Sequence, residues 1–218
     1  MIRSMTSILR AAVLALIASS SSASAQAASP YVRSPTAATA ATTMDKGQKM
    51  DDLKPFVRDG SRILESMTGD LTGSGRSDTV LVIDPPGVSE GKLGEGPART
   101  VLLLVRAVGG GLRLASANAH VVPCATCGGV AGDPFGYIKI EHGAFTIVNG
   151  GGSRERWSDA YTFTYASERR DWIVTRVVRK VTDTESGAEK HIELGPEELG
   201  STSFHDFDPA KVPEVNLP

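Results

Sequence analysis

Residues 123–135 read PCATCGGVAGDPF and hold both cysteines of this 218-residue chain, Cys124 and Cys127. Two cysteines at C-x-x-C spacing in an exported protein most simply form a local disulfide. The two glycines that follow permit positive φ, and the Asp-Pro pair near the end of the stretch favours a turn. We therefore predict a disulfide-clipped loop between two β segments.

Three other uses of this cysteine pair can be weighed from the residues. A structural zinc site needs four ligands, so zinc would have to recruit two of the four histidines, His120, His142, His191 and His205. Covalent haem needs C-x-x-C-H, whereas Gly128 occupies the fifth position. Thiol-disulfide exchange by Cys124 and Cys127 stays open as the alternative function, although the glycines after Cys127 are a poor helix start for activating a thiol.

The segment before the cysteines predicts a three-stranded antiparallel meander. Residues 79–83 (TVLVI) and 100–105 (TVLLLV) are β-branched or apolar at nearly every position, which is typical of strands buried on both faces. A Gly-Gly-Gly turn leads from the second run into a third strand at 112–118. We expect the first two strands to be central in the sheet.

The segment after the cysteines predicts two hairpins. Residues 137–141 (YIKIE) and 144–148 (AFTIV) alternate around a His-Gly turn, and 161–165 (YTFTY) pairs with 172–181 (WIVTRVVRKV). Between the hairpins, the run Gly150–Gly152 either breaks the sheet or lets another backbone approach closely.

The ends of the chain complete the expected architecture. Residues 51–67 predict a short helix, or a turn followed by extended chain, residues 196–199 one helical turn, and residues 204–218 an extended tail over the sheet. The fold class is therefore all-β: an antiparallel sheet or sandwich of about six or seven strands, forming a single domain over residues 51–218.

The N-terminus predicts export. Residues 1–25 have two arginines, a short apolar run and an Ala-Ser-Ala site, which together indicate a signal peptide cleaved after Ala25. Residues 26–50 are rich in Ala, Thr and Ser and predict a disordered linker. Removing residues 1–25 leaves 21 basic against 25 acidic residues, a formal charge of about −4. We expect a soluble periplasmic or secreted protein without a membrane span or a nucleic-acid partner.

The loop that starts at Asp70 has the spacing of a calcium-binding loop, with Asp70, Thr72, Ser74 and Asp78 in the ligand positions. Hydroxyl groups at two of these four positions are weak ligands. The favoured interpretation is an Asx-type turn in which Asp70 accepts hydrogen bonds from backbone amides. Calcium is the one cofactor that the sequence leaves open.

A second candidate surface consists of Arg154, Arg156, Trp157 and Tyr161, which could bind an acidic or sugar ligand. The simpler interpretation is a solvated strand edge with a core tryptophan. The chain has no G-x-S-x-G, H-E-x-x-H, P-loop or dinucleotide fingerprint, and we assign no catalytic residue. The main hypothesis is a non-enzymatic module for binding or assembly in the envelope, with an unidentified envelope protein or ligand as partner.

The stretch 69–82, GDLTGSGRSDTVLV, resembles the repeat motif of FG-GAP and VCBS-type β proteins. Together with CATCGGVAGDPF, GGSRERW, YTFTY and FHDFDP it resembles a family of exported bacterial β-rich proteins that carry one such motif. The resemblance implies an exported all-β domain and no established catalytic residue. It places the motif's calcium ligands at Asp70, Thr72, Ser74 and Asp78, with the backbone of Arg76, and makes a calcium-stabilised module the third hypothesis.

Overall fold

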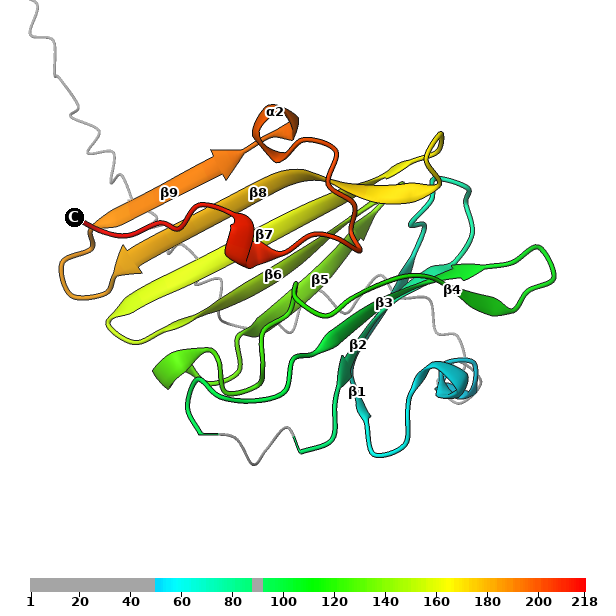
Figure 1. Cartoon of the computed structure of the whole chain (residues 1–218), viewed down its shortest axis with the longest axis horizontal. Coiled ribbons are helices and arrows are strands. Elements are labelled where there is room, and N and C mark those ends of the chain that lie inside the picture. The colour runs from blue at the N-terminus through cyan, green and yellow to red at the C-terminus, as the bar shows by residue number, and fades with distance from the viewer. Residues whose placement is uncertain (1–49, 88–91) are drawn as a thin grey trace, which may run out of the picture.

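The structure is a computed structural model that describes residues 50–87 and 92–218. It confirms the all-β fold and contains nine strands in two antiparallel sheets (Figure 1). The first sheet has the order β1-β2-β3-β4 and the second the order β5-β6-β7-β8-β9. The strands are β1 (Arg62–Gly69), β2 (Asp78–Asp84), β3 (Thr100–Arg106), β4 (Leu112–Asn118), β5 (Phe135–Glu141), β6 (Ala144–Gly152), β7 (Glu155–Ala166), β8 (Asp171–Asp183) and β9 (Glu189–Leu194).

Short helical turns lie between and beyond the strands. They are the 3-10 turns η2 (Lys54–Phe56), η3 (Gly129–Ala131) and η4 (Pro209–Lys211), and the α-helical turn α2 (Pro196–Leu199). The turn η2 followed by β1 confirms the turn and extended chain expected at the start of the domain, and α2 confirms the predicted helical turn. In the described ranges, no helix has the length and apolar character needed to cross a membrane. The predicted signal peptide and residues 26–49 of the predicted linker lie outside these ranges.

The first sheet confirms the predicted meander. Every residue of β2 is buried, and β3 is buried at its five central positions, because these strands occupy the middle of the sheet and are covered on both faces. One face packs against the second sheet. The other carries a separate apolar cluster of Leu81, Leu102 and Leu104, which Leu53 covers from the segment before β1.

The second sheet confirms both predicted hairpins, β5-β6 and β7-β8. On its inner face, the rings of Phe145 and Phe163 stack with centroids 5.1 Å apart. The C-terminal tail adds Phe204 and Phe207 to this cluster, and both are almost fully buried. Figure 1 shows the tail crossing the face of the second sheet, as predicted. Since the tail contributes core aromatic rings, it is part of the fold.

Two strands beyond the six or seven expected lie at sheet edges. The strand β1 has only partly buried or exposed residues, and β9 (EKHIEL) has no fully buried one. An edge strand pairs on one side only, so its sequence needs little of the apolar pattern that marks a central strand.

Candidate functional site

The cysteine loop is closed by a disulfide between Cys124 and Cys127, with the two Cα atoms 5.1 Å apart. This confirms the predicted local bond. The loop before β3 packs beside the disulfide: the Gly94 amide donates to the Thr126 carbonyl at 2.8 Å, and the Thr126 hydroxyl donates to the Glu95 carbonyl at 2.6 Å. The side chain of Cys124 is buried. These hydrogen bonds therefore join the disulfide-closed loop and the loop before β3 into one unit.

Arg99 fixes this unit to the sheets, and sequence reasoning missed it. Its guanidinium is fully buried and donates to Asp84 at 2.6 Å and to both carboxylate oxygens of Asp133. Asp84 ends β2 and is buried, whereas Asp133 belongs to the cysteine loop. A signal was present, because Asp84 and Arg99 flank two apolar strands that pair antiparallel and must therefore meet at one end of the sheet.

Backbone contact between glycines provides a second attachment of the cysteine loop. The Gly152 amide donates to the Gly128 carbonyl at 2.8 Å. A Cβ added at Gly151 would lie 2.6 Å from that carbonyl oxygen and 2.8 Å from the ring of Trp157. Of the two predicted roles for the Gly150–Gly152 run, close approach of another backbone is the one observed, while β6 continues to Gly152.

In the Asp70 loop, the carboxylate of Asp70 accepts hydrogen bonds from three amides. The amides of Thr72 and Ser74 donate to Oδ1 at 3.3 and 2.9 Å, and the Gly75 amide donates to Oδ2 at 2.9 Å. His142 Nδ1 also lies 2.8 Å from Oδ2. Burial by itself would raise the pKa of Asp70, but the three amide hydrogen bonds lower it below its usual value. This arrangement is the geometry of an Asx-type turn.

The other carboxylate of the loop, Asp78, is fully buried and also surrounded by donors. Its Oδ2 accepts from the Leu71 amide and the Thr72 hydroxyl, and its Oδ1 accepts from the Arg106 amide. The hydroxyls of Thr72 and Ser74 lie 2.8 Å apart. Across the described residues, no three His, Cys, Asp or Glu side chains are grouped closely enough to hold a metal ion. Calcium binding by this loop remains a hypothesis beside the favoured interpretation of an Asx-type turn.

The four residues of the predicted basic and aromatic surface have different environments. Arg154 pairs with Asp183 at 2.8 Å, and Arg156 donates to the Gly152 carbonyl at 3.2 Å. Trp157 and Tyr161 lie on the opposite face of β7 from Arg156, because side chains alternate along a strand. Trp157 is half-buried, and Tyr161 is 2% exposed. The structure therefore places the tyrosine in the core and the two arginines at the strand and its turn.

Tyr161 belongs to a buried polar group beneath the tail. Its hydroxyl donates to Asp159 at 2.8 Å, and Arg179, on the neighbouring strand β8, donates to the tail carbonyls of Pro209 and Val212 at 2.7 and 3.0 Å. Burial raises the pKa of Asp159, although Arg179 and the Tyr161 hydroxyl act in the opposite direction. Burial also raises the pKa of Tyr161. The group attaches the tail to the sheet.

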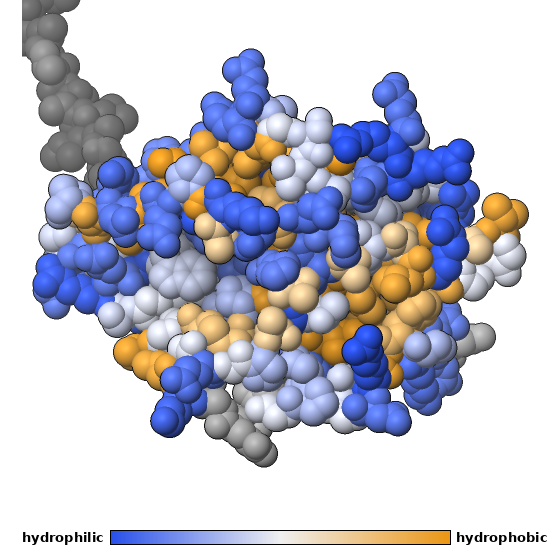
Figure 2. Space-filling model, in the orientation of Figure 1, coloured by the Kyte–Doolittle hydropathy of each residue, from blue (hydrophilic) through white to orange (hydrophobic). Residues whose placement is uncertain are grey.

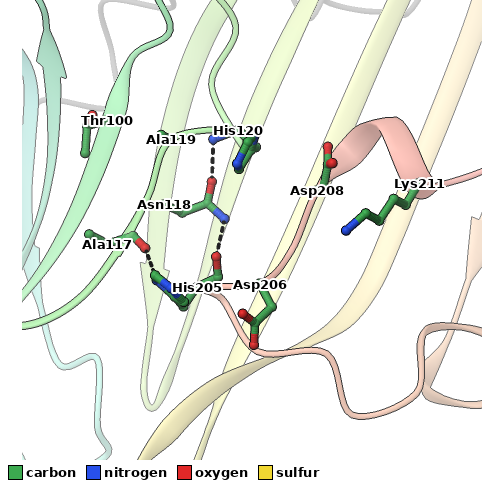
Figure 3. A pocket seen from close by; sticks show the side chains of 9 residues that line it. All are labelled: Thr100, Ala117, Asn118, Ala119, His120, His205, Asp206, Asp208 and Lys211. Carbon is green, nitrogen blue, oxygen red and sulfur yellow. Dashed lines mark hydrogen bonds between the residues drawn. The ribbon is translucent and has the colours of Figure 1, made fainter.

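A hollow of about 450 Å³ lies between the end of β4 and the tail (Figure 3). Its walls come from three segments: the start of β3, the end of β4 with the residues after it, and the tail. The lining residues are Thr100, Ala117, Asn118, Ala119, His120, His205, Asp206, Asp208 and Lys211. Sequence reasoning did not find this site, because its histidines are far apart in the chain.

Asn118 holds the walls of the hollow together. Its amide nitrogen donates to the tail carbonyls of Phe204 and Phe207 at 2.6 and 2.7 Å, while its oxygen accepts from the amides of His120 and Val121. All four bonds are to backbone groups. Asn118 therefore sets the distance between the tail and the loop after β4.

The polar side chains that face the hollow differ in how far other described residues satisfy them. Within residues 50–87 and 92–218, the Lys211 ammonium and the His120 imidazole have no hydrogen-bond or ion-pair partner. His205 Nδ1 lies 2.9 Å from the Ala117 carbonyl, so this nitrogen carries the proton and Nε2 is left for other contacts. Asp206 and Asp208 each accept from a group of the tail itself, the Ser203 hydroxyl and the Ala210 amide.

Comparison with known proteins gives no match: no protein-family model, curated protein or solved structure resembles the chain at a significant level. The resemblance to the FG-GAP and VCBS motifs therefore remains a prediction.

Proposed function

We propose that this chain is a non-catalytic binding domain exported to the bacterial envelope, and that its ligand occupies the hollow beside the tail. The observation that carries the proposal is the convergence on one cavity of polar groups from the loop after β4 and from the tail, of which the His120 imidazole and the Lys211 ammonium make no bond to another described residue. In Figure 3, His120 and Lys211 face the hollow from opposite sides, with Asp208 between them, and His205 and Asp206 lie below. A cavity of this size that is lined by a few converging polar groups has the character of a small-molecule site.

The charges around the hollow restrict the class of ligand. The Lys211 ammonium and the imidazoles of His120 and His205 line the hollow together with the carboxylates of Asp206 and Asp208. The two carboxylates repel a ligand with several negative charges, and the ammonium repels a ligand with several positive charges. A ligand with many hydroxyl groups can donate to carboxylates and imidazoles and accept from the ammonium. We therefore propose a saccharide, uncharged or zwitterionic, as the ligand.

Two further observations support an exported, pre-organised binding domain. The disulfide fits an oxidising compartment, where such bonds persist. Two walls of the hollow are also held in place, because Asn118 bonds to the tail and to the loop after β4, and Val121 and Val122 in that loop are fully buried. A rigid site loses little conformational entropy when a ligand binds.

The test is a titration of the ¹⁵N-labelled exported chain with soluble peptidoglycan fragments and with neutral oligosaccharides, followed by amide chemical shifts. We expect the shifts to be concentrated at Ala119, His120 and Lys211. Lys211→Ala and His120→Ala should each weaken binding, whereas Lys139→Ala, which removes an exposed lysine from β5, should leave it unchanged. Shifts confined to other surfaces, or no shifts with any saccharide, would contradict the proposal.

A further inference from the structure

A second, smaller hollow of about 200 Å³ lies between the tail and the end of the second sheet. Its walls come from β8, the end of β9, the turn α2 with the residues after it, and the tail. Figure 2 shows hydrophobic surface between α2 and the tail, with hydrophilic surface on both sides. Six of the eleven lining residues are apolar, namely Val174, Leu194, Leu199, Phe207, Val212 and Pro213.

Hydrogen bonds hold the walls of this second hollow on both sides. On the side of α2, the Thr202 hydroxyl donates to the Leu199 carbonyl at 3.0 Å, and the Val174 amide donates to the Thr202 carbonyl at 3.0 Å. On the side of the tail, Arg179 donates to the Val212 carbonyl at 3.0 Å. The shape of the hollow is therefore set by the fold, and a group that enters it orders little of the protein.

The two hollows meet along the tail. Three side chains, those of Asp206, Asp208 and Lys211, line both of them and so stand at the boundary. The two hollows differ in character, because the apolar lining residues of the first are the small Ala117 and Ala119 alone. One ligand can therefore occupy both hollows, with a polar part in the first, an apolar part in the second and the link between the two parts beside the shared side chains.

The charges at the boundary restrict the link between the two parts of the ligand. Three carboxylates line the second hollow, those of Glu198 and the two shared aspartates, against the single ammonium of Lys211. The free carboxylate of a fatty acid would therefore be repelled. An amide link is neutral: its N–H can donate to Asp206 or Asp208, and its carbonyl can accept from Lys211, which has no other partner in the described residues.

We propose that the ligand is an N-acylated saccharide, with its sugar in the first hollow and its acyl chain in the second. This inference rests on the proposed function, since it assigns a further part of the same ligand. A volume of about 200 Å³ corresponds to roughly seven molecules of liquid water, so the chain that fits is short. Burial of its methylene groups against the apolar walls supplies the affinity that the sugar alone lacks.

The first test is a titration of the ¹⁵N-labelled exported chain with glucose and with glucosamine that carries an acetyl, butanoyl or hexanoyl chain on its nitrogen. We expect all four to shift the amides of Ala119 and His120, and the longer chains also to shift those of Leu199 and Thr202. Affinity should rise by up to about fourfold for each methylene that the second hollow takes up. Sodium hexanoate, which has a carboxylate in place of the amide, should bind at least about tenfold more weakly than hexanoylglucosamine.

The second test uses two leucine variants. Leu199→Glu places a carboxylate in the apolar wall and should remove the gain in affinity from acetyl to hexanoyl. Leu93→Glu is the matched control, because Leu93 is 67% exposed in the loop before β3 and lines neither hollow, so this variant should keep the full gain. Circular dichroism establishes that each variant is folded. If Leu199→Glu is unfolded, the chain-length series on the wild type decides.

The outcomes separate this inference from the proposed function. Shifts at Ala119 and His120 with an affinity that is independent of chain length would overturn the acyl site and leave the saccharide site standing. A full gain in folded Leu199→Glu, or hexanoate binding as tightly as hexanoylglucosamine, would also overturn it. Shifts at Leu199 without shifts at Ala119 or His120, or no shifts with any probe, would contradict the proposed function and with it the assignment of one shared ligand.

Discussion

Arg99 and Asp133 form a two-pronged ion pair, with Nη1 to Oδ1 at 2.6 Å and Nη2 to Oδ2 at 2.5 Å. The same guanidinium contacts Asp84 at the end of β2. One buried side chain thus connects the first sheet with the loop that carries the disulfide. Breaking this connection should disturb the fold more than breaking the disulfide.

Arg99→Ala should lower the free energy of unfolding by about 3 to 5 kcal/mol, because it leaves the carboxylate of Asp84 buried without its inner partner. Arg62→Ala is the matched control. Arg62 contacts the same carboxylate but its side chain is 68% exposed, so its removal should cost about 1 kcal/mol or less. Urea unfolding followed by the fluorescence of buried Trp172 measures both variants. Equal losses of unfolding free energy in the two variants would show that the burial of Arg99 is unimportant.

Replacing Cys124 and Cys127 together by serine should lower the free energy of unfolding by about 2 kcal/mol, because the bond closes a very short loop. Arg99 and the glycine contact still hold the loop in place. Thermal denaturation of the double variant should therefore show one cooperative transition at a lower temperature. Complete loss of folded protein would mean that the loop is needed for the whole fold.

The reduction potential of the same bond separates a structural disulfide from a thiol-exchange site. We expect a value below about −300 mV, as for structural disulfides of exported proteins. Packing of the 94–96 segment against the cysteine loop supports this expectation. Equilibration with dithiol redox buffers and trapping of free thiols give the value. A potential in the range of glutaredoxins or of protein disulfide isomerase would instead favour the redox function.

Calcium should leave the melting temperature unchanged relative to a chelator. The carboxylates of Asp70 and Asp78 already accept hydrogen bonds from amides, and two of the four ligand positions hold hydroxyl groups. A cation would have to displace these donors. Differential scanning calorimetry in chelator and in millimolar calcium makes the comparison. A clear rise in melting temperature with calcium would establish the calcium-stabilised module.

Asp183 should make stability depend on pH in the acid range. A hydrogen bond from the Ser186 amide, and then the pairing with Arg154, lower the pKa of Asp183 from 3.8 to about 2. A lowered carboxyl pKa stabilises the folded state above the unfolded pKa, and this contribution is lost as pH falls through the folded value. Asp183→Asn should be less stable than the wild type at neutral pH. Urea unfolding should show the two converging between about pH 4 and pH 2, and a constant difference would contradict this assignment.

The parts of the fold that the sequence predicted are those with a local signal. Runs such as 79–83 and 100–105 indicate buried strands because nearly every position is apolar, and alternation around tight turns indicates the two hairpins. The edge strands β1 and β9 lack such a signal. Their assignment as strands depends on pairing with the neighbouring strand, which only the structure shows. The glycines at 150–152 left two roles open until the carbonyl of Gly128 was seen against them.

The candidate sites also differ in whether residues close in the chain or distant in the chain form them. The short separation of Cys124 and Cys127 makes their bond predictable, because few residues of chain have to be ordered to bring them together. His120 and His205 are far apart in the chain and lie in segments with no shared pattern. They meet because the tail inserts Phe204 and Phe207 into the core and Asn118 bonds to its carbonyls.

The sequence by itself determined the all-β class, the central strands, the hairpins and the local disulfide, since each depends on the chemistry of residues close in the chain. Only the tertiary structure decided that Arg99 is buried between two aspartates, that the tail is part of the core, and that two hollows meet along the tail. Those features depend on which distant segments exclude water from one another, and a pattern of near neighbours does not contain that information.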